Sequence, residues 1–143
     1  MKSTPITAFL LGLTTGVAMA QNAPLTVNVS QFKNTKGTAR YWLYRSAEGF
    51  LTNEQNAVRI VDVPITGMTS RYVFENLPAG TYALTVIHDE NGNHRFDTTL
   101  FGLPKEAYGT SNNARGGLNG PPKFEKARFT HAPTGTTVTV TVE

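Results

Sequence analysis

The stretch Leu77-Pro78-Ala79-Gly80-Thr81-Tyr82-Ala83-Leu84-Thr85-Val86-Ile87 decides the fold of this chain. From Tyr82 to Ile87 every residue except Thr85 is apolar, which is typical of a central strand covered on both faces. Gly80 has no side chain and permits a tight entry into that strand. Tyr82 can pack its ring inside while its hydroxyl bonds a nearby turn, as in a tyrosine corner. We therefore expect a domain built around this strand.

Apolar residues recur at every second position on both sides of this stretch, the period of a strand with one buried face. Such runs, or short runs of strand-forming residues, lie at 25–29, 40–45, 58–63, 71–74, 126–131 and 138–142. Turn signals separate them, and a short helix is expected only at 46–57. The pattern predicts an all-β fold, a single antiparallel β-sandwich of about seven strands with one long ordered loop.

The first twenty residues have the three parts of a secretory signal peptide. Lys2 precedes an apolar run at 6–17, and Ala18-Met19-Ala20 has the A-x-A pattern of a cleavage site. The run is shorter than the roughly 20 apolar residues that span a bilayer; the alternative is an uncleaved amphipathic anchor. We predict a signal peptide at 1–20, a domain at 21–143, a periplasmic or secreted location, and no membrane span after cleavage.

The composition argues against several classes of function. The chain has no Cys, so disulfides, thiolate metal sites and a cysteine lipid anchor are excluded. Its 13 Lys and Arg, against 10 Asp and Glu, are spread along the chain and form no basic stripe, which argues against nucleic-acid binding. Packing, or a bound ion, must then supply the stability of a domain in an oxidising compartment.

The loop after the central strand carries a candidate calcium site. Asp89, Asn91, Asn93 and Asp97 occupy relative positions one, three, five and nine of this loop. Arg95, at position seven, would contribute only its backbone carbonyl. Calcium takes about 6–8 oxygen ligands, and a curling loop with oxygen-bearing side chains at alternate positions can wrap one ion.

This loop differs from an EF-hand. Position six is His94 instead of Gly, and position twelve is Leu100 instead of a bidentate Glu, so water or Glu106 would complete the shell. With two formal negative charges, the affinity for calcium should be weak, with a Kd of about 10⁻⁴–10⁻³ M. The alternative is a plain hairpin turn, because Asn91-Gly92-Asn93 tolerates positive φ and Asp89 can bond its own backbone.

The Gly- and Pro-rich segment 99–125 does not fit the strand pattern. Connections of this length in a compact domain are uncommon and are usually functional or disordered. Three aromatic residues, Phe101, Tyr108 and Phe124, predict that the segment packs back onto the domain as an ordered loop. The candidate ligand-binding residues on it are Glu106, Tyr108, Asn112 and Asn113.

Signals for catalysis are weak. Cross-strand or capping roles are expected for His88, His94 and His131, because zinc needs three or four good ligands. Ser111 lies outside any G-x-S-x-G nucleophile motif. We therefore expect no enzyme; the minor alternative is a small metal-dependent hydrolase using Asp89, His94 and Asp97.

Linked motifs resemble one exported bacterial family, domain of unknown function 2141. The similar segments are 77–83, 88–93 with Asp97, 101–106, Tyr108-Gly109, 111–114, Pro121-Pro122, Phe124, Ala127 and Phe129. The main departure is His94-Arg95, where a small residue and Lys would be more usual. The resemblance implies an immunoglobulin-like or prealbumin-like (transthyretin-like) sandwich in the periplasm or outside the cell, and it implies no established activity.

These observations favour an exported, non-enzymatic binding or interaction module. Its surface would be built from the loops 89–97 and 99–125, with a weak calcium site as a staple. The expected partner is an unknown envelope protein or glycan. The main alternative is a structural envelope subunit that associates through the edges of its sheets.

Overall fold

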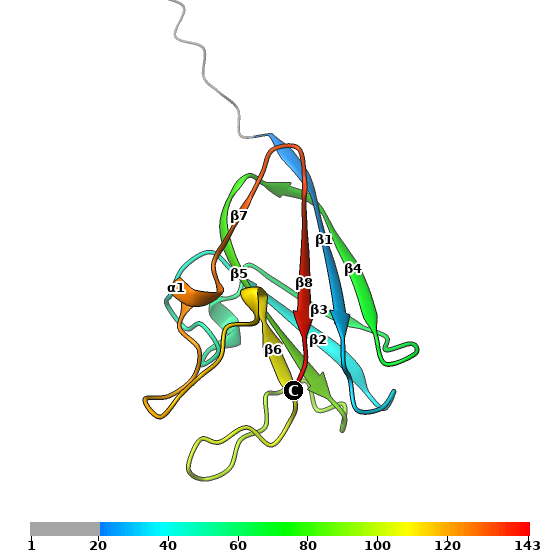
Figure 1. Cartoon of the computed structure of the whole chain (residues 1–143), viewed down its shortest axis with the longest axis vertical. Coiled ribbons are helices and arrows are strands. Elements are labelled where there is room, and N and C mark those ends of the chain that lie inside the picture. Colours follow the sequence, from blue (N-terminus) through cyan, green and yellow to red (C-terminus); the bar gives the residue numbers. More distant parts are fainter. Residues whose placement is uncertain (1–20) are drawn as a thin grey trace, which may run out of the picture.

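The computed structural model describes residues 21–143, which form a mostly β-stranded domain (Figure 1). The expected signal peptide at 1–20 lies outside the described residues. In chain order the elements are β1 (Asn22–Ser30), β2 (Thr38–Tyr44), the 3₁₀ turn η1 (Glu54–Asn56), β3 (Arg59–Val63), β4 (Ser70–Pro78), β5 (Gly80–Asp89), β6 (Tyr108–Thr110), the 3₁₀ turn η2 (Ser111–Asn113), α1 (Phe124–Ala127), β7 (Phe129–His131) and β8 (Thr136–Thr141).

The eight strands of the described chain form two sheets. One has the order β4-β1-β8, and the other has the order β3-β2-β5-β6, with β7 pairing to the first residues of β5. All these pairs are antiparallel except β1 and β8, which run parallel from Leu25↔Thr136 to Ser30↔Thr141. The expectation of a purely antiparallel arrangement is wrong at this pair. The alternation of apolar and polar residues is the same in parallel and antiparallel strands, so it does not reveal in which direction the paired strand runs.

β5 is the buried centre of the larger sheet, as the sequence predicts. Its residues from Tyr82 to Asp89 are all buried. Tyr82, Leu84 and Val86 face a core shared by both sheets, whereas Ala83 and Ile87 belong to a second cluster on the other face. The hydroxyl of Tyr82 donates to the carbonyl of Pro78 at 2.8 Å, the turn contact expected of this tyrosine.

The second apolar cluster covers the outer face of the larger sheet. It joins β2 and β5 to the segment after β2 and to α1, through Trp42, Tyr44, Phe50, Leu51, Ala83, Ile87, Phe124 and Ala127. The rings of Tyr44 and Phe50 meet edge to face at 5.3 Å, and those of Phe50 and Phe124 at 5.9 Å. These contacts bury the end of segment 99–125 against the sheet.

Segment 99–125 is not one long loop, contrary to expectation. β6 and η2 divide it, and α1 begins at Phe124. What remains exposed are two loops, which we call the first tip (98–104) and the second tip (115–121). Phe124 is buried and Tyr108 is half-buried, as expected, but Phe101 is 92% exposed and its predicted burial is wrong. A three-residue strand such as β6 is too short to show an alternating pattern.

Two other local expectations are corrected. The run 126–131 starts as the last turn of α1, in which the backbone carbonyl of Phe124 accepts from the N–H of Arg128 at 2.8 Å, and only Phe129–His131 is strand. The short helix expected at 46–57 is the three-residue turn η1. Asn53 caps it by accepting a hydrogen bond from the N–H of Gln55 at 3.1 Å.

Candidate functional site

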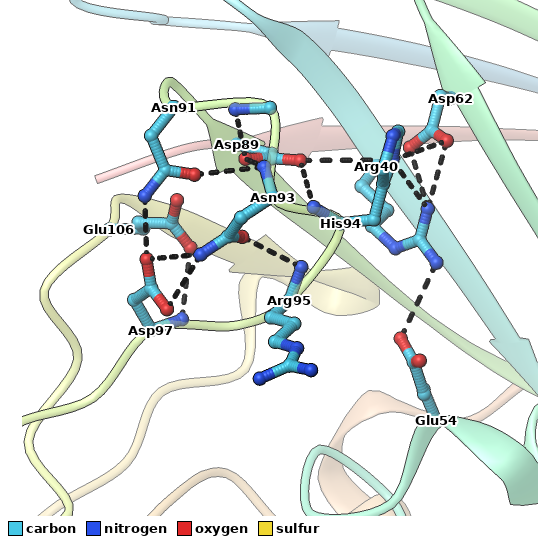
Figure 2. Close-up of polar contacts among 11 residues, drawn as sticks. Arg40, Glu54, Asp62, Asp89, Asn91, Asn93, His94, Arg95, Asp97 and Glu106 are labelled. Carbon is cyan, nitrogen blue, oxygen red and sulfur yellow. Dashed lines mark hydrogen bonds and ion pairs between the residues drawn. The ribbon is translucent and has the colours of Figure 1, made fainter.

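Asp89, the last residue of β5, anchors the loop that follows (Figure 2). Its buried carboxylate accepts hydrogen bonds from three backbone N–H groups: those of Gly92 (2.8 Å), Asn93 (3.2 Å) and His94 (2.9 Å). These donors offset the cost of burying the charge. Gly37 packs against the same residue, because a Cβ there would lie 1.8 Å from the Asp89 carbonyl oxygen.

Asn91, Asn93 and Asp97 form a hydrogen-bonded group on the outer side of this loop (Figure 2). The amide nitrogens of Asn91 and Asn93 donate to the Asp97 carboxylate, Asn91 at 2.8 Å and Asn93 at 2.9 and 3.0 Å. Their amide oxygens accept from the N–H groups of Asn93 (3.0 Å) and Arg95 (2.9 Å). The two amide donors lower the pKa of Asp97, and the positive charges of Lys105 and Arg95 add to the effect.

Glu106 reaches this group from the chain just before β6. Its Oε2 accepts from the N–H of Asp97 at 3.0 Å, while its Oε1 is buried and has no hydrogen-bond partner. Partial burial raises the pKa of Glu106, and the nearby charges of Asp97, Asp89 and Glu90 raise it further, against the lowering effect of the Asp97 N–H. The side chain is thus held in a site that disfavours its negative charge.

The structure therefore places the side chains of Asp89, Asn91, Asn93 and Asp97 in one loop with Glu106 (Figure 2). The guanidinium of Arg95 points away from them, but the expected ligand at Arg95 is its backbone carbonyl. Their oxygens now serve hydrogen bonds within the loop, which is the geometry of the turn alternative. Among residues 21–143, no three His, Asp or Glu side chains converge as a metal-binding group. A cation here would need the amide oxygens of Asn91 and Asn93, which would have to rotate toward it.

A second polar cluster, which the sequence analysis missed, lies beside this loop (Figure 2). Arg40 of β2 is buried; its Nη1 donates to both carboxylate oxygens of Asp62 on β3 (2.9 and 2.8 Å), and its Nη2 lies 3.4 Å from Glu54. His94 joins the cluster, with its Nδ1 3.1 Å from Asp62. His94 has a φ of +60°, in the left-handed region that favours Gly, and its imidazole lies against Asp62.

The other two histidines are buried and hold backbone carbonyls. His88 Nε2 lies 2.9 Å from the carbonyl oxygen of Lys36. His131 Nε2 lies 3.2 Å from the carbonyl oxygens of both Ala23 and Leu77.

The polar residues of η2 fasten segment 99–125 to the domain. Ser111 is fully buried; its Oγ accepts from the N–H of Leu84 at 2.9 Å and donates to the carbonyl of Ala127 at 2.6 Å. Asn112 donates to the carbonyls of Lys126 and Arg128, and Asn113 accepts from the N–H and hydroxyl of Thr141. All three side chains hydrogen-bond to other parts of the domain, Ser111 in its interior and the exposed Asn112 and Asn113 at its surface. Runs of Ser and Asn also mark ordinary turns, so the sequence carried no signal for this role.

A groove of about 1040 Å³ lies between η1, the loop end at 95–98 and the two tips. Its lining is partly aromatic, with Trp42, Phe96 and Tyr108 among its residues. The ring of Phe96 contacts both others edge to face, at 6.3 Å from Trp42 and 5.3 Å from Tyr108. The indole Nε1 of Trp42 is buried without a hydrogen-bond partner. The sequence showed none of this, because the lining comes from six separate parts of the chain.

Within residues 21–143 no helix has the length and apolar character needed to cross a membrane.

Comparison with known proteins identifies a bacterial family. No curated protein and no solved structure shows significant similarity to the chain. The bacterial family described as "Uncharacterized protein conserved in bacteria (DUF2141)" matches residues 27–139. Since the match covers most of the sequence, the chain belongs to the DUF2141 family.

Proposed function

We propose that this protein is an exported, non-enzymatic binding module of immunoglobulin-like or transthyretin-like sandwich form. Its ligand, an envelope glycan or envelope protein, would enter the groove between η1 and the two tips. The groove itself carries the proposal: its volume of about 1040 Å³ is at the upper end of the range for ligand sites, and its aromatic lining is typical of such sites.

The chemistry of the lining favours binding over catalysis. Among the described residues, the groove is lined by no Ser, Cys or His, and its two carboxylates, Glu54 and Glu143, are in ion pairs with Arg40 and Arg115. Partial burial raises the pKa of Tyr108 above its ordinary value of 10.0, against the lowering effect of Arg115. Ser111 is buried and already bonded on both sides. Trp42 Nε1 is buried and has no hydrogen-bond partner in the protein.

Export is supported by where the domain starts. β1 begins at Asn22, two residues after the Ala18-Met19-Ala20 motif, so cleavage after Ala20 would leave both sheets intact. Amino-terminal sequencing of the protein from the periplasmic and culture fractions should give Gln21 as the first residue. A chain that retains Met1 and stays in the cytoplasm would refute export.

The single tryptophan of the chain allows a direct test of the groove. Because Trp42 lines it, soluble peptidoglycan fragments that bind should change Trp42 fluorescence. Arg95→Ala, in the lining, should weaken the response, whereas Arg71→Ala, on β4 of the other sheet, should not. If the fragments give no response, cross-linking from the groove in intact cells tests the envelope-protein arm. Failure of both arms, or equal loss in the two variants, would refute groove binding.

We carry the calcium site forward as part of the same proposal. The observation that favours it is the buried, unpartnered Oε1 of Glu106 next to the carboxylates of Asp97 and Asp89. A cation would relieve this repulsion if the amides of Asn91 and Asn93 rotated their oxygens inward.

Thermal unfolding with chelator and with calcium raised to about 10–100 mM, which is 100 times the expected Kd, tests the site. Calcium at 100 times its Kd should add about 2.7 kcal/mol of stability, and the Asp97→Ala variant should lose this gain. An unchanged midpoint at every calcium concentration would show that the loop is a plain turn.

A further inference from the structure

The two tips place large apolar side chains in solvent. Leu100 and Phe101 of the first tip and Leu118 of the second are almost fully exposed, and Leu103 is 64% exposed. The other exposed large apolar residues among those described, Val58, Ile60 and Met68, are 36–45% exposed and lie elsewhere. Folded soluble domains rarely collect exposed apolar side chains in one place without a binding role.

Both tips have a defined backbone. In the first tip the Thr99 hydroxyl accepts from the N–H groups of Phe101 (3.3 Å) and Leu103 (3.1 Å), and the Thr99 carbonyl accepts from Gly102 (2.9 Å). In the second, Gly117 and Gly120 exchange both backbone hydrogen bonds around Leu118-Asn119. These hydrogen bonds satisfy part of each tip's backbone, which lowers the cost of placing the tip in the interfacial layer of a bilayer.

Both tips lie in the lower part of the view in Figure 1, the first tip below the carboxyl terminus and the second tip below α1. Residues from both tips also line the same groove. A single surface that covers this groove would therefore contact both tips.

Positive charge lies at the base of each tip. Lys105 follows the first tip and Lys123 follows the second, and both are exposed. Neither makes an ion pair within residues 21–143. The tips themselves contain no Asp or Glu. Exposed lysines beside the apolar tips match the phosphate headgroups that lie next to the acyl chains of an anionic bilayer. Lys105 also acts on Asp97, and Glu125 follows Lys123 closely in the sequence, so the attraction depends on these two lysines and not on a net positive patch.

We propose that the two tips dock this protein on the surface of an anionic phospholipid bilayer. Leu100, Phe101 and Leu118 enter the boundary between headgroups and acyl chains, while Lys105 and Lys123 contact phosphates. The apolar contacts supply affinity and the lysines supply the preference for anionic lipid. This docking does not depend on a ligand in the groove, and the domain stays on one side of the membrane.

Sedimentation with vesicles tests the proposal. The probe is phosphatidylethanolamine–phosphatidylglycerol vesicles, with phosphatidylcholine vesicles as the neutral comparison. The protein is residues 21–143, which contain both sheets and the complete core, so that residues 1–20 cannot supply the binding. The double variant Phe101→Ser/Leu118→Ser should bind anionic vesicles at least about tenfold more weakly.

Matched variants separate the tips from general surface effects. Ile60→Ser/Met68→Ser removes two exposed apolar residues outside the tips and should bind like the wild type. Lys105→Gln/Lys123→Gln should lose the preference for anionic vesicles, and Lys33→Gln/Lys36→Gln should keep it. Because all these residues are exposed, unfolding midpoints should stay within a few degrees of the wild type.

An inserted probe gives a second readout. In Phe101→Trp the new indole should shift its emission to the blue on anionic vesicles and be quenched by brominated acyl chains, while Met68→Trp should show neither effect. The proposal is overturned if the wild type does not sediment with anionic vesicles, or if the tip and control variants lose binding equally. It is also overturned if Phe101→Ser/Leu118→Ser abolishes self-association in native mass spectrometry while vesicle binding persists, since the tips would then be a protein interface.

Discussion

The inner and outer parts of segment 99–125 differ in which side chains they direct toward the domain and which they expose to solvent. In the inner part, residues 106–114, the polar side chains of Ser111, Asn112 and Asn113 are turned onto the domain and bonded to backbone groups of four other elements or loops. In the outer part, the two tips, the apolar side chains of Phe101 and Leu118 stand in solvent.

The difference separates what this segment does for stability from what it offers to other molecules. A buried hydroxyl with two backbone partners, as in Ser111, contributes to folding, because losing it leaves a carbonyl without a partner inside the protein. An exposed Leu or Phe contributes little to folding, because it is as wet in the native state as in the unfolded chain. The inner part should therefore be sensitive to substitution, and the tips tolerant.

The largest difference in stability is expected between Ala substitutions at two glycines, one in the inner part and one in a tip. A Cβ at Gly109 of β6 would lie 2.1 Å from the carbonyl oxygen of Thr141, whereas a Cβ at Gly117 of the second tip meets nothing within 4 Å. Gly109→Ala should lower the free energy of unfolding by about 3 kcal/mol, and Gly117→Ala by less than about 0.5 kcal/mol. Urea denaturation measures both; similar losses in the two variants would break the comparison.

Ser111 should show the next largest effect. Ser111→Ala removes the acceptor for the Leu84 N–H and the donor to the Ala127 carbonyl, and should cost about 1–3 kcal/mol. Asn119→Ala, at the exposed turn of the second tip, is the control and should change stability by less than about 0.5 kcal/mol. Equal stability of Ser111→Ala and the wild type in urea would show that the hydroxyl is not the fastener proposed.

A smaller effect should appear in acid at Asp97. Its pKa is lowered in the folded state from an ordinary value of 3.8, so its contribution is complete above that value and is lost as the pH falls through the folded pKa. The wild type should therefore lose part of its stability below about pH 4, and Asp97→Asn should lack that part of the pH dependence. Glu125→Gln, at an exposed residue of α1, should leave the acid limb unchanged; thermal melts across pH give the comparison.

The smallest effect, of opposite sign, is expected at Glu106. Its pKa is raised in the folded state, so ionisation destabilises the fold as the pH rises through this range. Without calcium, Glu106→Gln should be more stable than the wild type at pH 7, by less than about 1 kcal/mol, and equal to it in acid. With calcium bound the variant should instead lose a ligand. A destabilised variant at pH 7 in chelator would contradict the repulsion between Glu106 and Asp97.

Much of this architecture follows from local patterns in the sequence. The apolar run of β5 predicts a central strand, and the structure confirms it with burial on both faces. The residue types of the loop 89–97 predict either a turn or a cation site, and the turn bonds are present. These features are predictable because their hydrogen bonds join residues within a few positions of one another.

The parallel pairing of β8 with β1 and the burial of Ser111 were decided only by tertiary structure. Tertiary structure also decided the exposure of Phe101 and the clustering of Arg40, Asp62 and His94. Each depends on which surfaces meet across many residues of chain. A phenylalanine is equally apolar in a core or at a loop tip, and whether it finds cover depends on what remains uncovered when the two sheets have closed. Sequence alone determined the longer strands and most turns, but not the short strand β6; long-range packing decided which side chains are left for a partner.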